Sequence, residues 1–319
     1  MGVEFKNRIM LAPMAGFSDY AMRRICHEWG CEASVTEMVS ATALVYGDKK
    51  TFRLARITEE EGEVALQLFG KEPTVVAEAA ARLAEAREGS VPPVAIDINM
   101  GCPVPKIFSN GEGSALMRSP ALIYDIVKAT ASAVELPVTV KLRLGIDSAH
   151  INVVECARAA EEGGAAMVCV HGRTRVKMYS GEANMELIAK VKENIKIPLI
   201  ANGDITSGEE ALRALKITGA DGVAIGRGAV GNPFIFSEIK AALYGGSFTP
   251  PTLSERIECA LRQLDYAISE KGEINAVKEA RKQIALYFKG FRGAAELRGE
   301  INMASTRDEV AAAMRHLEG

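Results

Sequence analysis

The chain has 319 residues, of which 48% are hydrophobic and 25% charged, and its formal net charge is −3. This composition is typical of a globular protein of one or two domains, and the charge argues against a uniformly basic nucleic-acid-binding protein. No apolar run approaches the ~20 residues that span a bilayer, and no secretory leader begins the chain, so we expect a cytoplasmic protein without a membrane partner.

Eight short, β-rich apolar runs occur before residue 226. They cover residues 9–12, 33–36, 64–68, 94–98, 138–142, 167–170, 198–201 and 222–225. Ala-rich segments with a 3.6-residue period, such as 74–88 and 155–162, lie between them. Apolar strands that alternate with helices indicate a parallel sheet, and eight such units in ~240 residues predict a (β/α)8 TIM barrel, an α/β fold. A doubly wound open sheet is the alternative, but the chain lacks its Gly-x-Gly-x-x-Gly fingerprint.

The chain from residue 252 onward shows helical patterns only, after a glycine pair at 245–246 and a proline pair at 250–251. We predict helices over 253–270, 275–289 and 306–317. Ser254 and Thr306 are the expected N-caps, because an acidic residue follows each of them closely. Residues 252–319 form either a small all-helical domain after a barrel domain of residues 1–245, or a helical extension without its own core.

The tail contains a basic stretch. Between Lys278 and Arg298, six basic residues outnumber two acidic ones. This charge suits an RNA phosphate backbone, although a solvated helix face has the same composition. The aromatic residues Tyr287, Phe288 and Phe291 recur here at helical spacing and are predicted to lie in the core.

Six cysteines occur, and none of them forms a Cys-x-x-Cys pair or stands in a zinc-binding histidine pattern. We therefore expect no metal site and no disulfide framework. Cys156 and Cys169 stand among apolar residues, as small core residues do. Cys102 stands between a glycine and a proline, where packing alone gives little reason for a thiol.

Polar residues gather where the predicted strands end. In a TIM barrel these ends meet at one mouth, which holds the active site. The residues are Gln67, Asn99, Cys102, Lys141, His171, Asn202, Gly203, Asp204, Gly226 and Arg227. The loops after the last two strands form the common phosphate site of such barrels, so they predict a phosphate-bearing ligand, unless their glycines only form turns.

Two of these residues have several chemical interpretations. Lys141 could form a Schiff base, hold the anionic edge of a reduced isoalloxazine ring, or reach solvent. His171 could bind phosphate, orient a ring, or bond to a neighbouring carbonyl group. The pattern alone leaves these alternatives open.

Seven segments resemble the tRNA-dihydrouridine synthase family in sequence and in order. They are residues 12–16 (Ala-Pro-Met-Ala-Gly), 67–70 (Gln-Leu-Phe-Gly), 97–103 (Asp-Ile-Asn-Met-Gly-Cys-Pro), 141–145 (Lys-Leu-Arg-Leu-Gly), 170–175 (Val-His-Gly-Arg-Thr-Arg), 201–205 (Ala-Asn-Gly-Asp-Ile) and 225–228 (Ile-Gly-Arg-Gly). The segment around Cys102 is highly specific, whereas 201–205 and 225–228 alone would indicate any flavin or phosphate barrel. Residues 281–290 and 294–298 resemble that family's helical domain, with a pattern closest to its bacterial B-type subfamily.

The resemblance implies an FMN enzyme that uses NADPH to reduce the 5,6 double bond of uridine in tRNA. The residues that it assigns to FMN are Pro13, Met14, Ala15, Gln67, Lys141, His171, Asn202, Gly203, Asp204, Gly226 and Arg227. Asn99, Arg173 and Arg175 are the candidates for the uracil and its neighbouring phosphates. In the basic stretch, Lys282 and Lys289 are candidates for the tRNA body. We expect a monomer that binds tRNA and NADPH.

The implied chemistry gives Cys102 a proton transfer. A hydride from reduced FMN adds to one alkene carbon of uracil, and the neighbouring carbon takes a proton from an acid on the opposite face. A thiol with an ordinary pKa of ~8.5 is protonated at neutral pH and can serve, provided that no strong cation lies beside it. The target base must also leave its RNA stack to react. A buried structural thiol is the alternative for Cys102.

Two other functions share part of this pattern. A flavin barrel that acts on a free pyrimidine, such as dihydroorotate or dihydropyrimidine dehydrogenase, has the same phosphate loops but needs no basic tail. A non-catalytic RNA-binding barrel would have no use for Cys102, Lys141 and His171. We therefore favour the tRNA-modifying enzyme.

Overall fold

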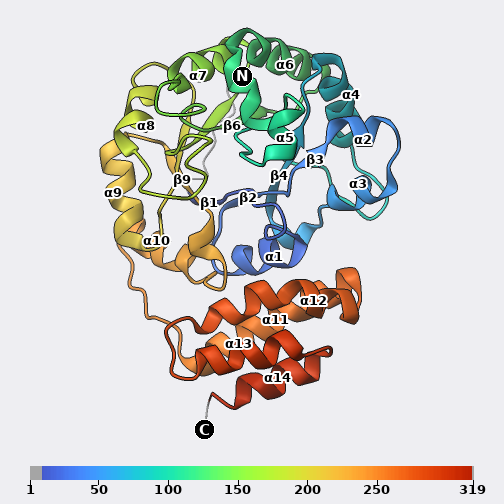
Figure 1. Ribbon diagram of the computed structural model, residues 1–319, viewed down its shortest axis with the longest axis vertical. Helices are drawn as coiled ribbons and strands as arrows, with labels where there is room; N and C mark the ends of the chain where they lie inside the picture. Colours follow the sequence, from blue (N-terminus) through green and yellow to red (C-terminus); the bar gives the residue numbers. More distant parts are fainter. Residues whose placement is uncertain (1–8, 318–319) are drawn as a thin grey trace.

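The computed structural model describes residues 9–317, and its centre is a closed parallel β-barrel (Figure 1). The eight barrel strands are β1 (Ile9–Leu11), β2 (Ala33–Val35), β4 (Glu63–Phe69), β5 (Ala95–Met100), β6 (Val138–Leu142), β7 (Met167–His171), β8 (Leu199–Asn202) and β9 (Gly222–Ile225). They pair in chain order, β1 pairs with β9, and β2 pairs with β4. The predicted TIM barrel is confirmed, and all eight predicted strands are present. A ninth, two-residue strand, β3 (Val39–Ser40), pairs with the end of β4 and was not predicted.

Helices surround the barrel (Figure 1). They are α1 (Tyr20–Glu28), α2 (Ala41–Val45), α3 (Lys49–Leu54), α4 (Pro73–Ala84), α5 (Pro105–Ser109), α6 (Pro120–Ala133), α7 (Val153–Glu162), α8 (Met185–Lys192), α9 (Gly208–Thr218) and α10 (Ile235–Tyr244), with 3₁₀ helices at Glu59–Glu61, Gly113–Arg118 and Arg227–Ala229. Local chemistry sets several boundaries. Ser119 caps α6, which begins with proline, and Ser207 caps α9. Gly219 ends α9 in the left-handed conformation.

Successive side chains of each strand point alternately toward the surrounding helices and into the barrel. This alternation determines which side chains reach the mouth of the barrel. Outward residues such as Leu66, Ile98 and Val140 are fully buried against the helices. Inward residues form a separate cluster of small and apolar side chains, including Ala65, Ala95 and Cys169. Two residues beyond Ala65, Ala95 and Cys169, the inward positions are the polar residues Gln67, Asp97 and His171. Small and apolar side chains therefore fill the interior of the barrel, and polar side chains lie at the mouth, where the strands have their carboxyl ends. This arrangement is expected for the fold.

The tail consists of α11 (Leu253–Lys271), α12 (Glu273–Ile284), a 3₁₀ helix (Ala285–Phe288), α13 (Ala294–Met303) and α14 (Arg307–Arg315). The all-helical tail is confirmed, although α13 was not predicted. Thr306 is the N-cap of α14, but the expected N-cap Ser254 is wrong. Thr252 caps α11 instead, because it exchanges hydrogen bonds with Glu255 in a capping box.

The tail packs against α1 and α10, below the barrel in Figure 1. One continuous cluster joins Met22 of α1 and Phe234 beside α10 to tail residues such as Leu264. Tyr287 and Phe288 are buried in it, as predicted. Phe291 was expected in the core but is 36% exposed, because it lies in the turn after the 3₁₀ helix. None of the helices within residues 9–317 is long and apolar enough to cross a membrane.

Candidate active site

A hydrogen-bonded network forms the floor of the barrel mouth. Asp97 of β5 accepts a hydrogen bond from Gln67 Nε2 at 2.6 Å and another from Thr139 Oγ1 at 2.6 Å. Burial raises the pKa of Asp97, while these two donors oppose the shift. Gln67 Oε1 accepts from Asn99 Nδ2 at 2.8 Å, so both ends of the Gln67 amide are engaged. Asp97 and Thr139 were not predicted as site residues, although their inward position near the carboxyl ends of β5 and β6 is a signal that could have identified them.

Cys102 lies in the loop after β5, and its main chain is held from two sides. Asn99 Oδ1 accepts the Cys102 backbone N–H at 2.9 Å. The hydroxyl of Ser114, which is fully buried, donates to the Cys102 carbonyl oxygen at 2.7 Å. These two bonds hold the main chain of Cys102 at both its N–H and its carbonyl group.

Cys102 is 9% exposed, and burial raises the pKa of its thiol. The expectation that no strong cation lies beside Cys102 is wrong. Arg143 donates from Nε to the carbonyl oxygen of Gly101 at 2.9 Å, and its charge lowers the pKa of the thiol. Burial nevertheless outweighs the charge, so the group is a protonated thiol at neutral pH.

Lys141 reaches the mouth from β6 and is 9% exposed. Its Nζ donates to Asn202 Oδ1 at 3.0 Å, and Asn202 Nδ2 donates to the carbonyl oxygen of Ala224 at 2.7 Å. Burial lowers the pKa of Lys141. The ammonium group of Lys141 carries three N–H donors. Within residues 9–317, its only hydrogen bond is the one to Asn202. An acceptor on a ligand at the mouth could satisfy the remaining donors.

His171 is the last residue of β7 and lies near four positively charged side chains. Burial lowers its pKa far below the usual range, and the charges of Lys141, Arg143, Arg173 and Arg227 lower it further. His171 is therefore neutral and can donate or accept a hydrogen bond without carrying charge. The concentration of cations at this mouth suits an anionic ligand.

Asp204 organises two of these arginines. Its carboxylate accepts from Arg173 Nη2 at 2.7 Å and from Arg227 Nη2 at 3.3 Å, and it also accepts from the backbone N–H of Ala183 at 2.8 Å. Gly203 precedes it with a φ of 130°, and a Cβ there would lie 2.7 Å from the Cβ of Ala183. Glycine is therefore required at 203 by the protein's own packing.

The predicted RNA-facing arginines lie in different environments. Arg173 is 2% exposed and donates from Nε to the carbonyl oxygen of Ser180 at 3.1 Å, so it is part of the protein interior. Arg175 is half-buried and stacks on Phe108 of α5, with its guanidinium carbon 3.9 Å from the ring centre. Arg118 lies 4.5 Å from the same ring centre. Phe108 thus links the loop after β7 to the loop that carries Cys102.

Tyr179 is an aromatic residue of the mouth that was not predicted. Tyr179 is 52% exposed, and the guanidinium carbons of Arg227 and Arg143 lie 4.9 and 5.8 Å from the centre of its ring. The ring centre of His171 is 6.5 Å away. A large exposed aromatic side chain beside two arginines is typical of a base-stacking surface.

The remaining predicted residues lie at one side of the mouth and on the tail. Pro13, Met14 and Ala15 form the loop after β1, and Met14 Sδ would lie 3.6 Å from a Cβ at Gly226. Lys282 on α12 and Lys289 are both exposed. The Nζ of Lys282 lies 4.8 Å from the ring centre of Phe17, so this lysine borders the β1–α1 loop. Within the described chain, no group of three His, Cys, Asp or Glu residues could hold a metal ion.

Residues 10–318 match the family described as dihydrouridine synthase (Dus). The chain belongs to the dihydrouridine synthase family. The enzymes of this family reduce uridine in tRNA with a flavin. The predicted resemblance is therefore confirmed over nearly the whole chain.

Several relatives of this dihydrouridine synthase are similar over almost their full length. A "Probable tRNA-dihydrouridine synthase" of Treponema pallidum is 39% identical over 98% of this chain and 94% of its own. The "tRNA-dihydrouridine synthase B" of Pseudomonas aeruginosa is 40% identical over 97% of this chain and 92% of its own. The structure of an old yellow enzyme homologue from Zymomonas mobilis covers 79% of this chain and 92% of its own, with a TM-score of 0.53 and 14% identity. This last similarity shows a common fold.

Proposed function

We propose that this dihydrouridine synthase reduces the 5,6 double bond of specific uridines in tRNA, with FMN as its bound cofactor and NADPH as its reductant. When bound, the reduced flavin supplies a hydride to one carbon of that double bond. The observation that carries the proposal is that one barrel mouth holds both a protonated Cys102, anchored by its main chain, and the buried Lys141.

Cys102 is the proposed acid. Its raised pKa keeps the proton on Sγ at neutral pH, where it can pass to the uracil carbon next to the one that accepts the hydride. Asn99 and Ser114 hold the main chain of Cys102, so the thiol needs little reorganisation before transfer. Asn99, expected to contact uracil, is proposed to act mainly through Cys102, because both ends of its amide are engaged.

The residues proposed for FMN are those at the mouth. The free donors of Lys141 suit the ring's anionic edge, and neutral His171 suits a hydrogen bond nearby. Pro13, Met14 and Ala15 would line the ring, with Gln67 below it. Asn202, Gly203, Gly226 and Arg227 would hold the ribityl chain and phosphate, with Asp204 orienting Arg227.

The uracil would enter beside Tyr179, whose exposed ring offers a stacking surface for a base that has left its helix. Arg175 is a proposed phosphate contact at the edge of the mouth. Arg173 is proposed to support the site through Asp204, since its guanidinium is buried and already paired.

Residues 252–319 are the proposed tRNA-binding domain, next to a catalytic domain of residues 1–245. Lys282 and Lys289 would contact the RNA backbone. The similarity to the "tRNA-dihydrouridine synthase B" of Pseudomonas aeruginosa supports a place in the B-type subfamily. We propose a cytoplasmic monomer.

Incubation of the purified protein with NADPH and an unmodified tRNA transcript tests this function. We expect a yellow protein with flavin absorbance, and dihydrouridine in the digested RNA by mass spectrometry of nucleosides. A flavoprotein that reduces free uracil or oxidises dihydroorotate but leaves tRNA unchanged would instead be a free-pyrimidine enzyme. A colourless protein that cannot be reconstituted with FMN, yet binds tRNA, would contradict catalysis altogether.

A further inference from the structure

The β1–α1 loop, residues 12–19, carries Met14 to the barrel mouth and is anchored on its barrel side. The Met14 carbonyl oxygen accepts the backbone N–H groups of Phe17 and Ser18, each at 2.9 Å. Ser18 Oγ accepts the Met14 N–H at 2.9 Å. Arg23, buried and paired with Glu61, donates to the Ser18 carbonyl oxygen at 2.7 Å. The loop is therefore a compact turn fixed to the barrel at its second half.

The opposite side of the same loop is held by the tail. Lys271, the last residue of α11, donates to Asp19 Oδ2 at 2.7 Å and to Glu279 Oε2 of α12 at 2.6 Å. Gln283 Nε2 donates to the Phe17 carbonyl oxygen at 3.4 Å. Two tail helices thus bind the loop, one at Asp19 and the other at Phe17.

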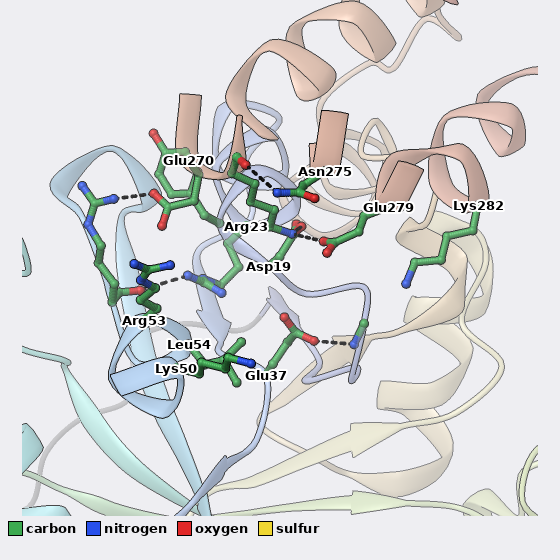
Figure 2. Close-up of a pocket in the computed structure, with 14 residues that line it drawn as sticks. Asp19, Arg23, Glu37, Lys50, Arg53, Leu54, Glu270, Asn275, Glu279 and Lys282 are labelled. Atoms are coloured by element: carbon green, nitrogen blue, oxygen red, sulfur yellow. Dashed lines mark hydrogen bonds and ion pairs between the residues drawn. The ribbon is translucent and has the colours of Figure 1, made fainter. Parts of the chain in front are cut away.

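Lys271, Asp19 and Glu279 line a cavity of about 630 Å³ between the barrel and the tail. Figure 2 shows its two walls, with Glu279 and Lys282 on the tail and Asp19 and Glu37 on the barrel. Because the walls are separated here, the Lys271–Asp19 ion pair is one of the few direct links from the tail to the loop. Its two side chains are only 26% and 14% exposed.

The ion pair is present at physiological pH. Burial lowers the pKa of Lys271, but Asp19 and Glu279 outweigh it and raise the pKa to about 12. Asp19 also caps α1, with Oδ1 accepting the Met22 N–H at 3.1 Å. The two carboxylate oxygens of Asp19 therefore have different partners. Oδ1 caps α1 of the barrel, and Oδ2 bonds to Lys271 of the tail.

We propose that Lys271 is a positioning residue that ties the helical tail to the β1–α1 loop through Asp19, so that the tail sets the loop conformation that presents Met14 to the flavin. This inference rests on the proposed function, because it assumes FMN at the mouth. It also gives the tail a second task besides RNA binding. By thermodynamic reciprocity, tRNA bound through the tail raises the affinity for FMN by the factor by which FMN raises the affinity for tRNA.

The test is a titration of flavin-free full-length protein with FMN, followed by fluorescence, in four single variants and in the double variant of Lys271→Met with Asp19→Asn. Lys271→Met removes the charge at similar length, and Asp19→Asn keeps an N-cap oxygen for α1 but loses the ion pair. Glu279→Gln is the matched control, since it removes the other partner of Lys271 without touching the loop. Lys271→Arg retains the charge and is the rescue variant.

We expect Lys271→Met and Asp19→Asn each to weaken FMN binding about fivefold, and the double variant to weaken it no more than either alone. Glu279→Gln and Lys271→Arg should stay within twofold of the unchanged protein. Saturating tRNA should strengthen FMN binding in the unchanged protein but not in Lys271→Met. Equal FMN affinity in all variants overturns the inference while leaving the proposed function intact.

A second measurement does not depend on the flavin. Hydrogen–deuterium exchange of the flavin-free protein should be faster across residues 13–19 in Lys271→Met and unchanged there in Glu279→Gln. Unchanged exchange in both overturns the inference. Absence of FMN binding by the unchanged protein would overturn the proposed function, and the inference with it, and is thus distinguishable from a failure confined to Lys271.

Discussion

Asn99 joins the floor of the barrel mouth to the main chain of Cys102. Its Oδ1 accepts the Cys102 backbone N–H at 2.9 Å, and its Nδ2 donates to Gln67 Oε1 at 2.8 Å. The same amide therefore connects Cys102 to the chain of hydrogen bonds that ends on Asp97. A substitution at Asn99 should therefore displace Cys102 more than it affects the cofactor site.

Asn99→Leu removes these bonds, and the one that Oδ1 accepts from the Gly101 N–H, while keeping the same number of branched side-chain heavy atoms. The unpaired groups of Gln67 and Cys102 should lower the free energy of unfolding by about 1–3 kcal/mol. Displacement of the thiol should slow tRNA reduction about 100-fold, because small errors in the position of a reacting group have that effect. Single-turnover kinetics with pre-reduced enzyme measure the second effect, and a rate within twofold of the unchanged protein would contradict this role for Asn99.

Gly113→Ala should act on Cys102 from the other side. Gly113 has a φ of 59°, and a Cβ there would lie 2.9 Å from the Cβ of Cys102. Gly245→Ala is the matched control, since Gly245 has a φ of 77° with nothing within 4 Å of its added Cβ. Both variants bear the cost of about 1 kcal/mol for a left-handed alanine. Only Gly113→Ala should also slow tRNA reduction, and equal rates in the two would argue against a close fit around Cys102.

The pH dependence of tRNA reduction should have one limb. The protonated thiol of Cys102 is the active form, so activity is complete below its pKa and is lost as the pH rises through it. Because burial raises that pKa, the loss should occur above the ordinary thiol range of ~8.5. His171, with its lowered pKa, should add no acid limb near pH ~6.5. A single-turnover profile showing a limb near that pH would mean that His171 titrates and that its environment is not as described.

The sequence pattern predicts the barrel and its mouth well, since a two-residue alternation decides which side chains face inward. Lys141 and His171 follow from this rule, because each lies two residues beyond an inward apolar or hydroxyl side chain on its strand. The partners of these residues do not follow from it. Whether Arg173 faces RNA or the interior depends on Asp204 and Ser180, which no local pattern pairs with it.

Part of the tail could likewise be predicted from the sequence, and part could not. Helical periodicity predicts α11, α12 and α14, but α13 is weakly amphipathic and was missed. Thr252 and Ser254 are both acceptable N-caps by residue type, and only Thr252 has Glu255 at the spacing of a capping box. The contact between Lys271 and Asp19 joins positions 252 residues apart, so no local sequence pattern predicts it.

Lys289→Glu should weaken tRNA binding and reduce its salt dependence. Lys289 is exposed on the tail, whereas Lys282 borders Phe17, so the charge at position 289 can be reversed without disturbing the β1–α1 loop. Removing one lysine–phosphate interaction should lower the slope of log affinity against log salt by about one. Lys216→Glu, at an exposed site on α9, is the control. Equal salt slopes for both variants and the unchanged protein would place the RNA elsewhere.

The most direct test of the central claim is the rate at which Cys102→Ala, loaded with FMN and pre-reduced by NADPH, forms dihydrouridine in unmodified tRNA in a single turnover. We expect FMN binding and flavin reduction to be unchanged and the rate of dihydrouridine formation to fall at least about 100-fold, the lower range for loss of a general acid. Formation of dihydrouridine at the full rate by Cys102→Ala would contradict the assignment of Cys102 as the proton donor.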